Sequence, residues 1–188
     1  MTKYILIDTT FFEGEYPGAF GYIEMDETGN SLRQGQILMK PDIDFEAEYQ
    51  HGTLTDGDGN VIDDDFGLDD EEVEAIRKDY EESPLWKCQS FPEAYPKLKE
   101  ILDQPDSVIF GMSAKDDEFL LNMTCRRYGL PEFDFFGKNL KSSVNKMIHN
   151  VMQHNESTDA TEDLTIVASV VNQICEADNR TILELLAE

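Results

Sequence analysis

Basic residues are scarce in this sequence. It contains 15 lysine and arginine residues against 40 aspartate and glutamate residues, and its formal net charge is −25. Such a charge repels polyphosphate chains, and it argues against a protein that holds nucleic acid mainly through the phosphates. The deficit is uneven, because Asp56–Glu82 carries 13 acids and two bases, whereas Lys115–Lys146 carries five acids and six bases. We therefore expect an anionic ligand to prefer the second segment.

Cysteine and long hydrophobic runs are also scarce. Cys88, Cys125 and Cys175 lie far apart without a CxxC pair, which indicates neither a zinc site nor a disulfide framework. We expect them to be buried thiols in a reducing compartment. No apolar run approaches the roughly 18 residues of a membrane span, and the first residues have a strand pattern rather than that of a signal peptide. We therefore expect a cytoplasmic protein that makes no contact with a membrane.

The apolar pattern predicts a mixed α/β fold. The chain has 188 residues, of which 40% are hydrophobic, and this suits a single domain over 1–188 with an acidic insertion around 56–82. Short apolar runs between turn residues predict an antiparallel meander of three strands and a later fourth strand, at Lys3–Asp8, Ala19–Met25, Gln36–Met39 and Ser107–Gly111. Helical spacing of apolar residues predicts five helices, at Asp69–Glu82, Phe91–Leu102, Lys115–Tyr128, Asn139–Met152 and Asp163–Cys175.

Acidic side chains stand where these elements begin or end. Asp8 closes the first strand, Asp116 and Asp117 open the helix after the fourth strand, and Asp163 opens the last long helix. Ends of strands and N-termini of the adjoining helices are where α/β folds place their ligand sites. Several converging carboxylates are what a pair of divalent cations requires. The simpler interpretation is that Asp8 starts a turn and that the other three complement helix dipoles.

The order of these acids resembles the DEDD superfamily of 3′–5′ exonucleases. In that family the first strand ends in D-x-E, and Ile5–Thr10 (ILIDTT) supplies the strand and Asp8. The second strand and its turn, GAFGYIEMDETGN, are also similar to the family pattern. The middle motif is an apolar strand, a small-residue loop and an acid on a helix, which SVIFGMSAKDDEFLLNMTCRRYGLP matches. Leu121 and Cys125 follow Asp117 at intervals of four, and this register favours Asp117 over Asp116 without excluding the latter.

The last motif places the resemblance in the DEDDh branch of the superfamily. Its pattern is H-x-A-x-x-D at the head of a helix, and TDATEDLTIVASVV supplies Ala160 and Asp163. Two positions depart from the family. Thr10 stands where the family has its glutamate, and Thr158 stands where this branch has the histidine that acts as general base. The resemblance extends over most of the chain, from about Lys3 to Cys175.

The resemblance implies a ribonuclease H-like fold of three layers, with a mixed central sheet and helices on both faces. It also implies two Mg²⁺ or Mn²⁺ ions held by Asp8, Asp117 and Asp163, and hydrolysis of phosphodiester bonds at single-stranded 3′ ends. Thr10 removes one negative charge from the metal site, and loss of a general base at Thr158 costs on the order of 10²–10⁴-fold in rate. We therefore expect weak or no activity, unless Glu13 or Glu15 replaces the glutamate, or His154 the base.

A second hypothesis is a non-catalytic module that keeps the fold and binds a basic protein through its acidic surface. The sequence does not distinguish DNA from RNA and does not predict the oligomeric state. Trp86, Phe133, Phe135 and Phe136 are expected in the core, although the three phenylalanines lie in the least acidic segment, where stacking on a single strand stays open. Arg126 and Arg127 are expected on an exposed helical face, with a substrate groove as the alternative.

Overall fold

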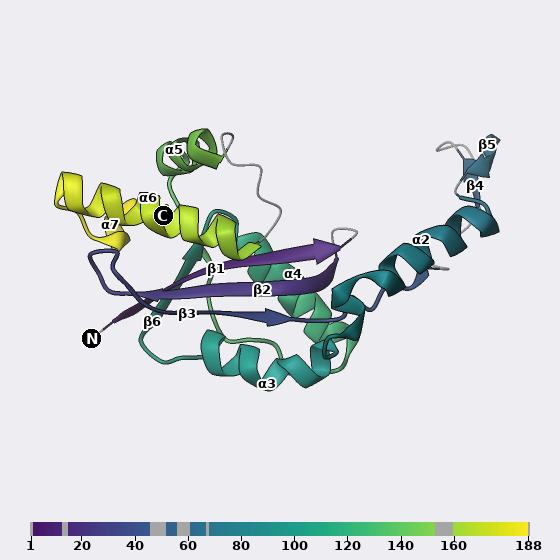
Figure 1. Cartoon of the computed structure of the whole chain (residues 1–188), viewed down its shortest axis with the longest axis horizontal. Coiled ribbons are helices and arrows are strands. Elements are labelled where there is room, and N and C mark those ends of the chain that lie inside the picture. The colour runs from purple at the N-terminus through teal and green to yellow at the C-terminus, as the bar shows by residue number, and fades with distance from the viewer. Residues whose placement is uncertain are drawn as a thin grey trace.

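A five-stranded sheet forms the centre of the molecule in the computed structural model (Figure 1). The structure describes residues 2–12, 15–45, 52–55, 61–66, 68–152 and 160–187. Nothing is described of the side chains of 52–55, 61–66 and 160–162. The strands follow the order β3-β2-β1-β6-β7, with bounds β1 Lys3–Phe12, β2 Tyr16–Met25, β3 Ser31–Leu38, β6 Ser107–Gly111 and β7 Lys138–Asn139.

The strand directions make the sheet mixed. β1 pairs antiparallel with β2, and β2 pairs antiparallel with β3, which confirms the meander. β1 pairs in parallel with β6, and β6 pairs in parallel with β7. Every residue of β2 is buried, because helices cover the sheet on both sides of this strand. β1 extends beyond the predicted end at Asp8, since its pairing with β2 continues as far as Phe12 and Tyr16.

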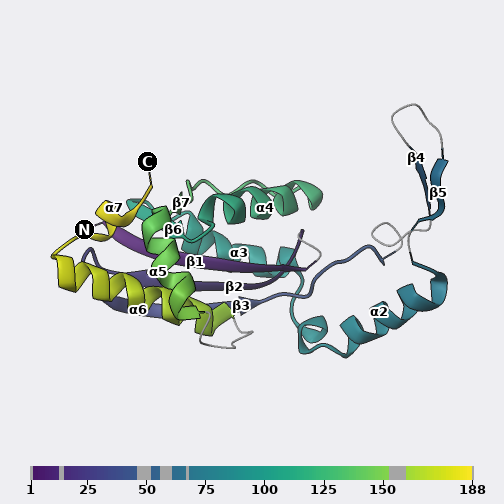
Figure 2. The same ribbon diagram turned by 90° about the horizontal axis from the view of Figure 1, so that it is seen from above.

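Helices cover both faces of the sheet (Figures 1 and 2). One face packs against α3 (Phe91–Leu102) and α4 (Ala114–Arg127). The other packs against α5 (Ser142–Met152), α6 (Ala160–Asp178) and the short α7 (Ile182–Leu185). Alternate residues of β1 enter the two separate cores, with Leu6 on the side of α6 and Ile5 and Ile7 on the side of α3 and α4. The predicted three-layer α/β fold is therefore confirmed.

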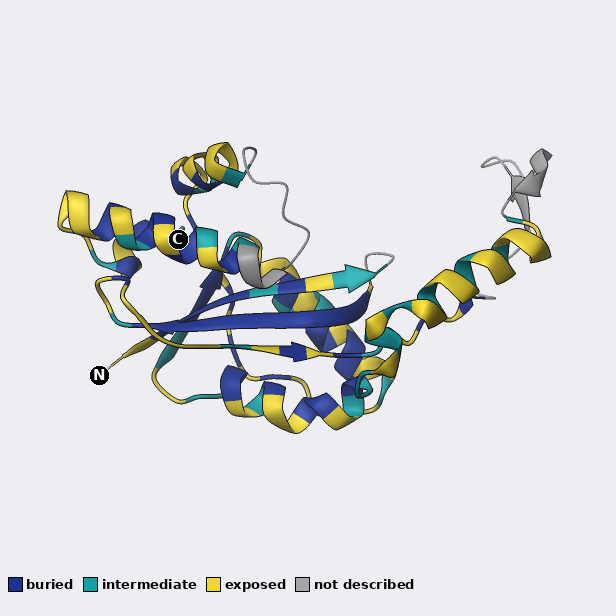
Figure 3. Cartoon of the chain, viewed as in Figure 1, coloured by how far each residue is buried: buried dark blue, intermediate teal, exposed yellow. Residues whose placement is uncertain are grey.

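An acidic arm projects from one end of the sheet (Figures 1 and 2). It consists of α2 (Asp70–Glu82) and the antiparallel strands β4 (Gly52–Thr55) and β5 (Val61–Phe66). No residue of α2 is fully buried, as Figure 3 shows by its exposed colouring. The short helix η1 (Pro84–Lys87) joins the arm to α3. The sequence predicted α2 but not the strand pair, and a single domain over 1–188 remains a prediction.

Some predictions about individual side chains hold and others do not. Phe133 and Phe135 are buried, but Phe136 is 81% exposed, so its predicted place in the core is wrong. Two cysteines are buried as expected, whereas Cys88 is only half-buried. Within the described part of the chain, no helix is long and apolar enough to cross a membrane.

Candidate active site

The candidate site lies where the parallel pairing of β1 with β6 ends. Their parallel pairing runs from Lys3 and Ser107 to Leu6 and Phe110, and β6 ends one residue later at Gly111. A Cβ atom at Gly111 would lie 2.6 Å from the carbonyl oxygen of Ile7, so only glycine allows the chain to pass this close. Beyond this point β1 continues without a parallel neighbour. The carboxyl ends of two parallel strands therefore meet at an opening, which is where α/β sheets bind ligands.

Asp8 is brought next to Asp163 by close packing of α6 on β2. Asp8 pairs with Gly21 across the sheet, and a Cβ atom at Gly21 would lie 2.3 Å from Cδ1 of Leu164. The missing side chain of Gly21 thus makes room for Leu164, the neighbour of Asp163. Both carboxylates line a small cavity of about 60 Å³ together with Met112. Burial raises the pKa of Asp8, and the negative charge of Asp163 raises it further.

Asp117 approaches Asp8 from the helix on the other face of the sheet. It lies in the first turn of α4 and is only 5% exposed. Burial raises the pKa of Asp117 to about 8, and the charges of Asp8 and Asp116 contribute to the rise. Interactions with Thr9 lower the pKa of Asp117 and offset part of this rise. The Asp117 carboxyl group therefore holds its proton at neutral pH, as a buried acid close to a second acid does.

The remaining predicted site residues take different places. Asp116 is exposed, and its negative charge acts on Asp117. Thr10 is also exposed and lies two residues beyond Asp8, on the same face of β1. Glu15, one of the predicted replacements, forms an ion pair of 2.9 Å with Arg127 at the far end of α4. Thr158 and the other two predicted replacements, Glu13 and His154, lie outside the described residues.

The described side chains of the site are of the type that binds a divalent cation, but their positions do not form a complete metal site. Aspartate oxygens are the ligands that Mg²⁺ and Mn²⁺ prefer, and Asp8 is electrostatically coupled to both Asp163 and Asp117. However, the described residues contain no group of three histidine, cysteine or acidic side chains that could hold a metal ion. The three aspartates therefore interact in pairs around Asp8, and their joint action as metal ligands remains a prediction.

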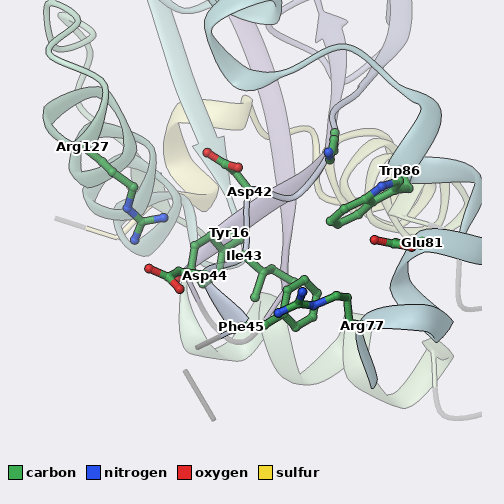
Figure 4. Close-up of a pocket in the computed structure, with 10 residues that line it drawn as sticks. Tyr16, Asp42, Ile43, Asp44, Phe45, Arg77, Glu81, Trp86 and Arg127 are labelled. Carbon is green, nitrogen blue, oxygen red and sulfur yellow. The ribbon is translucent and has the colours of Figure 1, made fainter. Parts of the chain in front are cut away.

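A larger cavity lies elsewhere, at the base of the arm (Figure 4). Its volume is about 720 Å³, and three basic side chains line it, each above an aromatic ring. The cation to ring-centre distances are 3.8 Å for Lys40 and Trp86, 4.4 Å for Arg127 and Tyr16, and 5.4 Å for Arg77 and Phe45. Three acids also line it, Asp42, Asp44 and Glu81.

The cavity at the arm base therefore contains as many acids as bases. Its basic groups already contact rings of the same chain, so we interpret it as the joint between the arm and the sheet. This cavity could not be predicted from the sequence, because its residues come from five separate segments of the chain. Arg126 and Arg127 are exposed on α4, as expected, and Arg127 also lines this cavity, which has no net positive charge.

Neither a protein-family model nor a curated protein sequence matches the chain. Solved structures do. The nuclease domain of 3′hExo, a DEDDh family member bound to rAMP, shares 14% identity over 99% of this chain and 96% of that domain, with a TM-score of 0.57. A 3′-exonuclease that recognises the histone mRNA stem-loop shares 14% identity over 95% of this chain and 84% of that one, with a TM-score of 0.55.

Exonuclease I is similar over part of its length. The metal-free complex of E. coli exonuclease I with single-stranded DNA shares 10% identity over 95% of this chain, with a TM-score of 0.58. This chain covers only 41% of that exonuclease. At such low identities the likeness concerns the fold alone. The chain has the ribonuclease H-like α/β fold of the DEDD 3′–5′ exonucleases.

Proposed function

We propose that this chain is a divalent-metal-dependent 3′–5′ exonuclease whose activity on single-stranded 3′ ends is weak or absent. The observation that supports this most is the coupling of Asp8 to both Asp163 and Asp117. These three side chains come from three different elements, and they lie at the opening between two parallel strands. Acidic groups that are buried beside one another are unfavourable for folding alone, and they mark a candidate functional site.

In this proposal Asp8, Asp117 and Asp163 hold Mg²⁺ or Mn²⁺. When bound, the ions would supply an activated water molecule and stabilise the leaving oxygen. Asp117 must lose its proton to act as a ligand, so binding should release protons and strengthen as the pH rises towards 8. Thr10 contributes a hydroxyl where a fourth carboxylate would complete the site. Thr158 has no group that accepts a proton from water at neutral pH.

Hydrolysis of a 5′-labelled single-stranded oligonucleotide with Mn²⁺ tests the proposal directly. We expect slow shortening from the 3′ end by the wild-type chain and none by Asp8→Ala or Asp117→Ala. Glu74→Ala is the matched control, because this acid is exposed on the arm. Asp116→Ala decides the middle ligand, since it should retain activity if Asp117 takes that role. Activity that Asp8→Ala retains in full would contradict the proposal.

Restoring the two family residues gives a stronger test of the same site. The double substitution Thr10→Glu and Thr158→His returns a carboxylate and a general base. We expect the rate to increase by about 10²-fold or more, because a positioned base alone typically contributes 10²–10⁴-fold. No gain in rate, with the fold intact by circular dichroism, would show that Asp8 does not stand at a degraded nuclease site.

The second candidate function is a binding module without catalysis. The observation that favours it is the arm, whose helix α2 carries acids in its first turn and no basic residue in its last turn. A basic protein is the partner that such a surface would attract. Two results together would favour this function over the first. One is the absence of any hydrolysis product at high enzyme concentration. The other is salt-sensitive binding of an oligolysine peptide that is lost when acids of α2 are neutralised by substitution.

A further inference from the structure

The outer face of α4 carries a groove of about 520 Å³. Lys115, Phe119 and Arg126 line it from the helix, and Phe136 and Lys138 line it from the segment that enters β7. We call these five residues and the space between them the α4 groove. Lys115 and Phe119 are four residues apart and share one face of the helix. Asp117, which lies between them in sequence, is buried on the opposite face against the sheet.

Two aromatic rings in the α4 groove are open to solvent. Phe119 is 60% exposed and Phe136 is 81% exposed. The segment that carries Phe136 packs tightly on the start of α4, since a Cβ atom at Gly137 would lie 2.1 Å from the carbonyl oxygen of Ala114. The Gly137 N–H group also donates a 2.7 Å hydrogen bond to the Glu118 carboxylate. These contacts fix the backbone beneath Phe136, and the exposure of its ring is a feature of the fold.

The charge of the α4 groove is opposite to that of the chain. Three bases and two acids line it, in a protein of net charge −25. Both acids are engaged, because Glu118 accepts the hydrogen bond from Gly137 and Glu132 accepts two from Arg126, at 2.8 and 3.0 Å. In the part of the chain that the structure describes, neither Lys115 nor Lys138 forms an ion pair. Two basic groups thus remain available to an anionic ligand.

We propose that the α4 groove binds single-stranded nucleic acid. Bases stack on Phe119 and Phe136, and phosphates lie near Lys115 and Lys138, which is the combination that single-strand binding proteins use. The inference rests on the proposed nuclease function in one respect, because single-stranded nucleic acid is the substrate class proposed for this chain; the groove itself lies on the face of α4 opposite to Asp117. An acidic peptide would satisfy the lysines, but it offers no flat rings to the two phenylalanines.

Binding without catalysis tests this proposal separately from the nuclease function. The experiment measures the fluorescence anisotropy of a labelled oligodeoxythymidine, about 12 nucleotides long, with the full chain in EDTA. The ionic strength should be about 0.15 M, because charges beyond about 8 Å are then screened and the groove acts on its own. Wild type is compared with Phe119→Ala/Phe136→Ala and with Lys115→Gln/Lys138→Gln. Leu183→Ala is the matched control, since Leu183 is 55% exposed on α7 and does not line the groove.

We expect the double phenylalanine variant to bind at least about tenfold more weakly, since stacking of one base contributes about tenfold or more. The double lysine variant should bind several-fold more weakly, and Leu183→Ala should match wild type. All four proteins should unfold at similar temperatures, because every changed side chain is exposed. An abasic oligonucleotide of equal length should bind poorly, because it has phosphates but no rings to stack.

Three results would overturn the proposal. The first is equal affinity of wild type and the double phenylalanine variant for the oligonucleotide. The second is equal affinity of wild type for the abasic and the normal oligonucleotide. The third is a higher affinity of wild type for a polyglutamate peptide than for the oligonucleotide. The hydrolysis assay stays independent of all three. Binding at the α4 groove is measured without metal, so the outcome of the hydrolysis assay bears on the nuclease function alone and leaves the groove proposal in place.

Discussion

The cleft at Asp8 and the arm at α2 are both acidic, but their acids have different surroundings. The acids of α2 lie on a helix without a fully buried residue, and Asp69 and Glu72 close its N-terminus as a capping box. In the cleft, Asp117 is 5% exposed, and burial raises the pKa of both Asp117 and Asp8, with a further contribution from the neighbouring acids. The acids of the arm therefore serve solubility and helix capping, whereas those of the cleft oppose folding.

In a chain with this many acids, the number of acids in a segment therefore does not locate a functional site. The segment with the most acids in the sequence is the arm, and it contains no buried carboxylate among the residues of α2. The cleft contains few acids, but they come from separate elements, and burial raises the pKa of two of them. Burial of neighbouring acids, rather than their number, distinguishes the candidate site.

The largest difference between the two regions should be in stability. Phe110 lies in β6 beneath the cleft and is completely buried, whereas Val73 on α2 is half-buried. Phe110→Ala should lower the free energy of unfolding by about 3–5 kcal/mol, because it leaves a cavity in the core. Val73→Ala should lower it by about 1 kcal/mol or less. Urea denaturation measures both, and similar losses at the two positions would contradict the comparison.

The second difference concerns pH. The pKa of Asp117 is raised from 3.8 to about 8 by folding, so between these values the unfolded state ionises while the folded state stays protonated. Wild type should therefore lose stability as the pH rises through this window, by at most about 1.4 kcal/mol per pH unit, and level off above it. Asp117→Asn should remove most of this dependence and be the more stable protein at pH 9.

Urea denaturation of both proteins between pH 4 and pH 9 provides the measurement. Asp79→Asn on α2 is the control, because this acid is exposed and its removal should leave the pH dependence of wild type in place. Parallel stability curves for wild type and Asp117→Asn would mean that the carboxyl group of Asp117 is not buried beside other charges, and the distinction between cleft and arm would fail.

The smallest effect is expected at the start of the arm. Asp69 caps α2 by accepting a 2.8 Å hydrogen bond from the backbone N–H group of Glu72. Asp69→Ala should destabilise this helix by about 1 kcal/mol. Hydrogen exchange should show faster exchange in α2 alone, because the helix has few contacts with the sheet. Faster exchange in β1 or β6 would mean that the arm and the cleft are coupled.

Most of the fold could be predicted because the sheet and its helices follow simple apolar periods. Runs of Ile, Leu and Tyr gave β1, and intervals of three and four residues gave α3 within its observed bounds. The strands of the arm were not predicted, since β4 has only four residues and β5 has three aspartates among its six residues. Phe136 was placed in the core on composition, but the adjoining Gly137 packs closely on Ala114, and the Phe136 ring is left exposed.

The candidate site could be predicted only as a set of residues. The motif spacing selected Asp8, Asp117 and Asp163, and the structure couples Asp8 to each of the other two. Spacing alone could not give the close packing of Leu164 over Gly21, which brings α6 to β1. The sequence indicated Lys115–Lys146 as the segment for an anionic ligand and left stacking on Phe136 open, but only the fold brings Phe119 and Phe136 together in one groove.

The most direct test of the account is an experimental structure of the chain soaked in Mn²⁺, with the metal located by its anomalous scattering. The account predicts a manganese ion bound to Asp8 together with Asp163 or Asp117, and the loss of that ion in Asp8→Asn. A chain that binds no manganese in this cleft at saturating concentration, or that binds it only on the arm, would contradict the central claim.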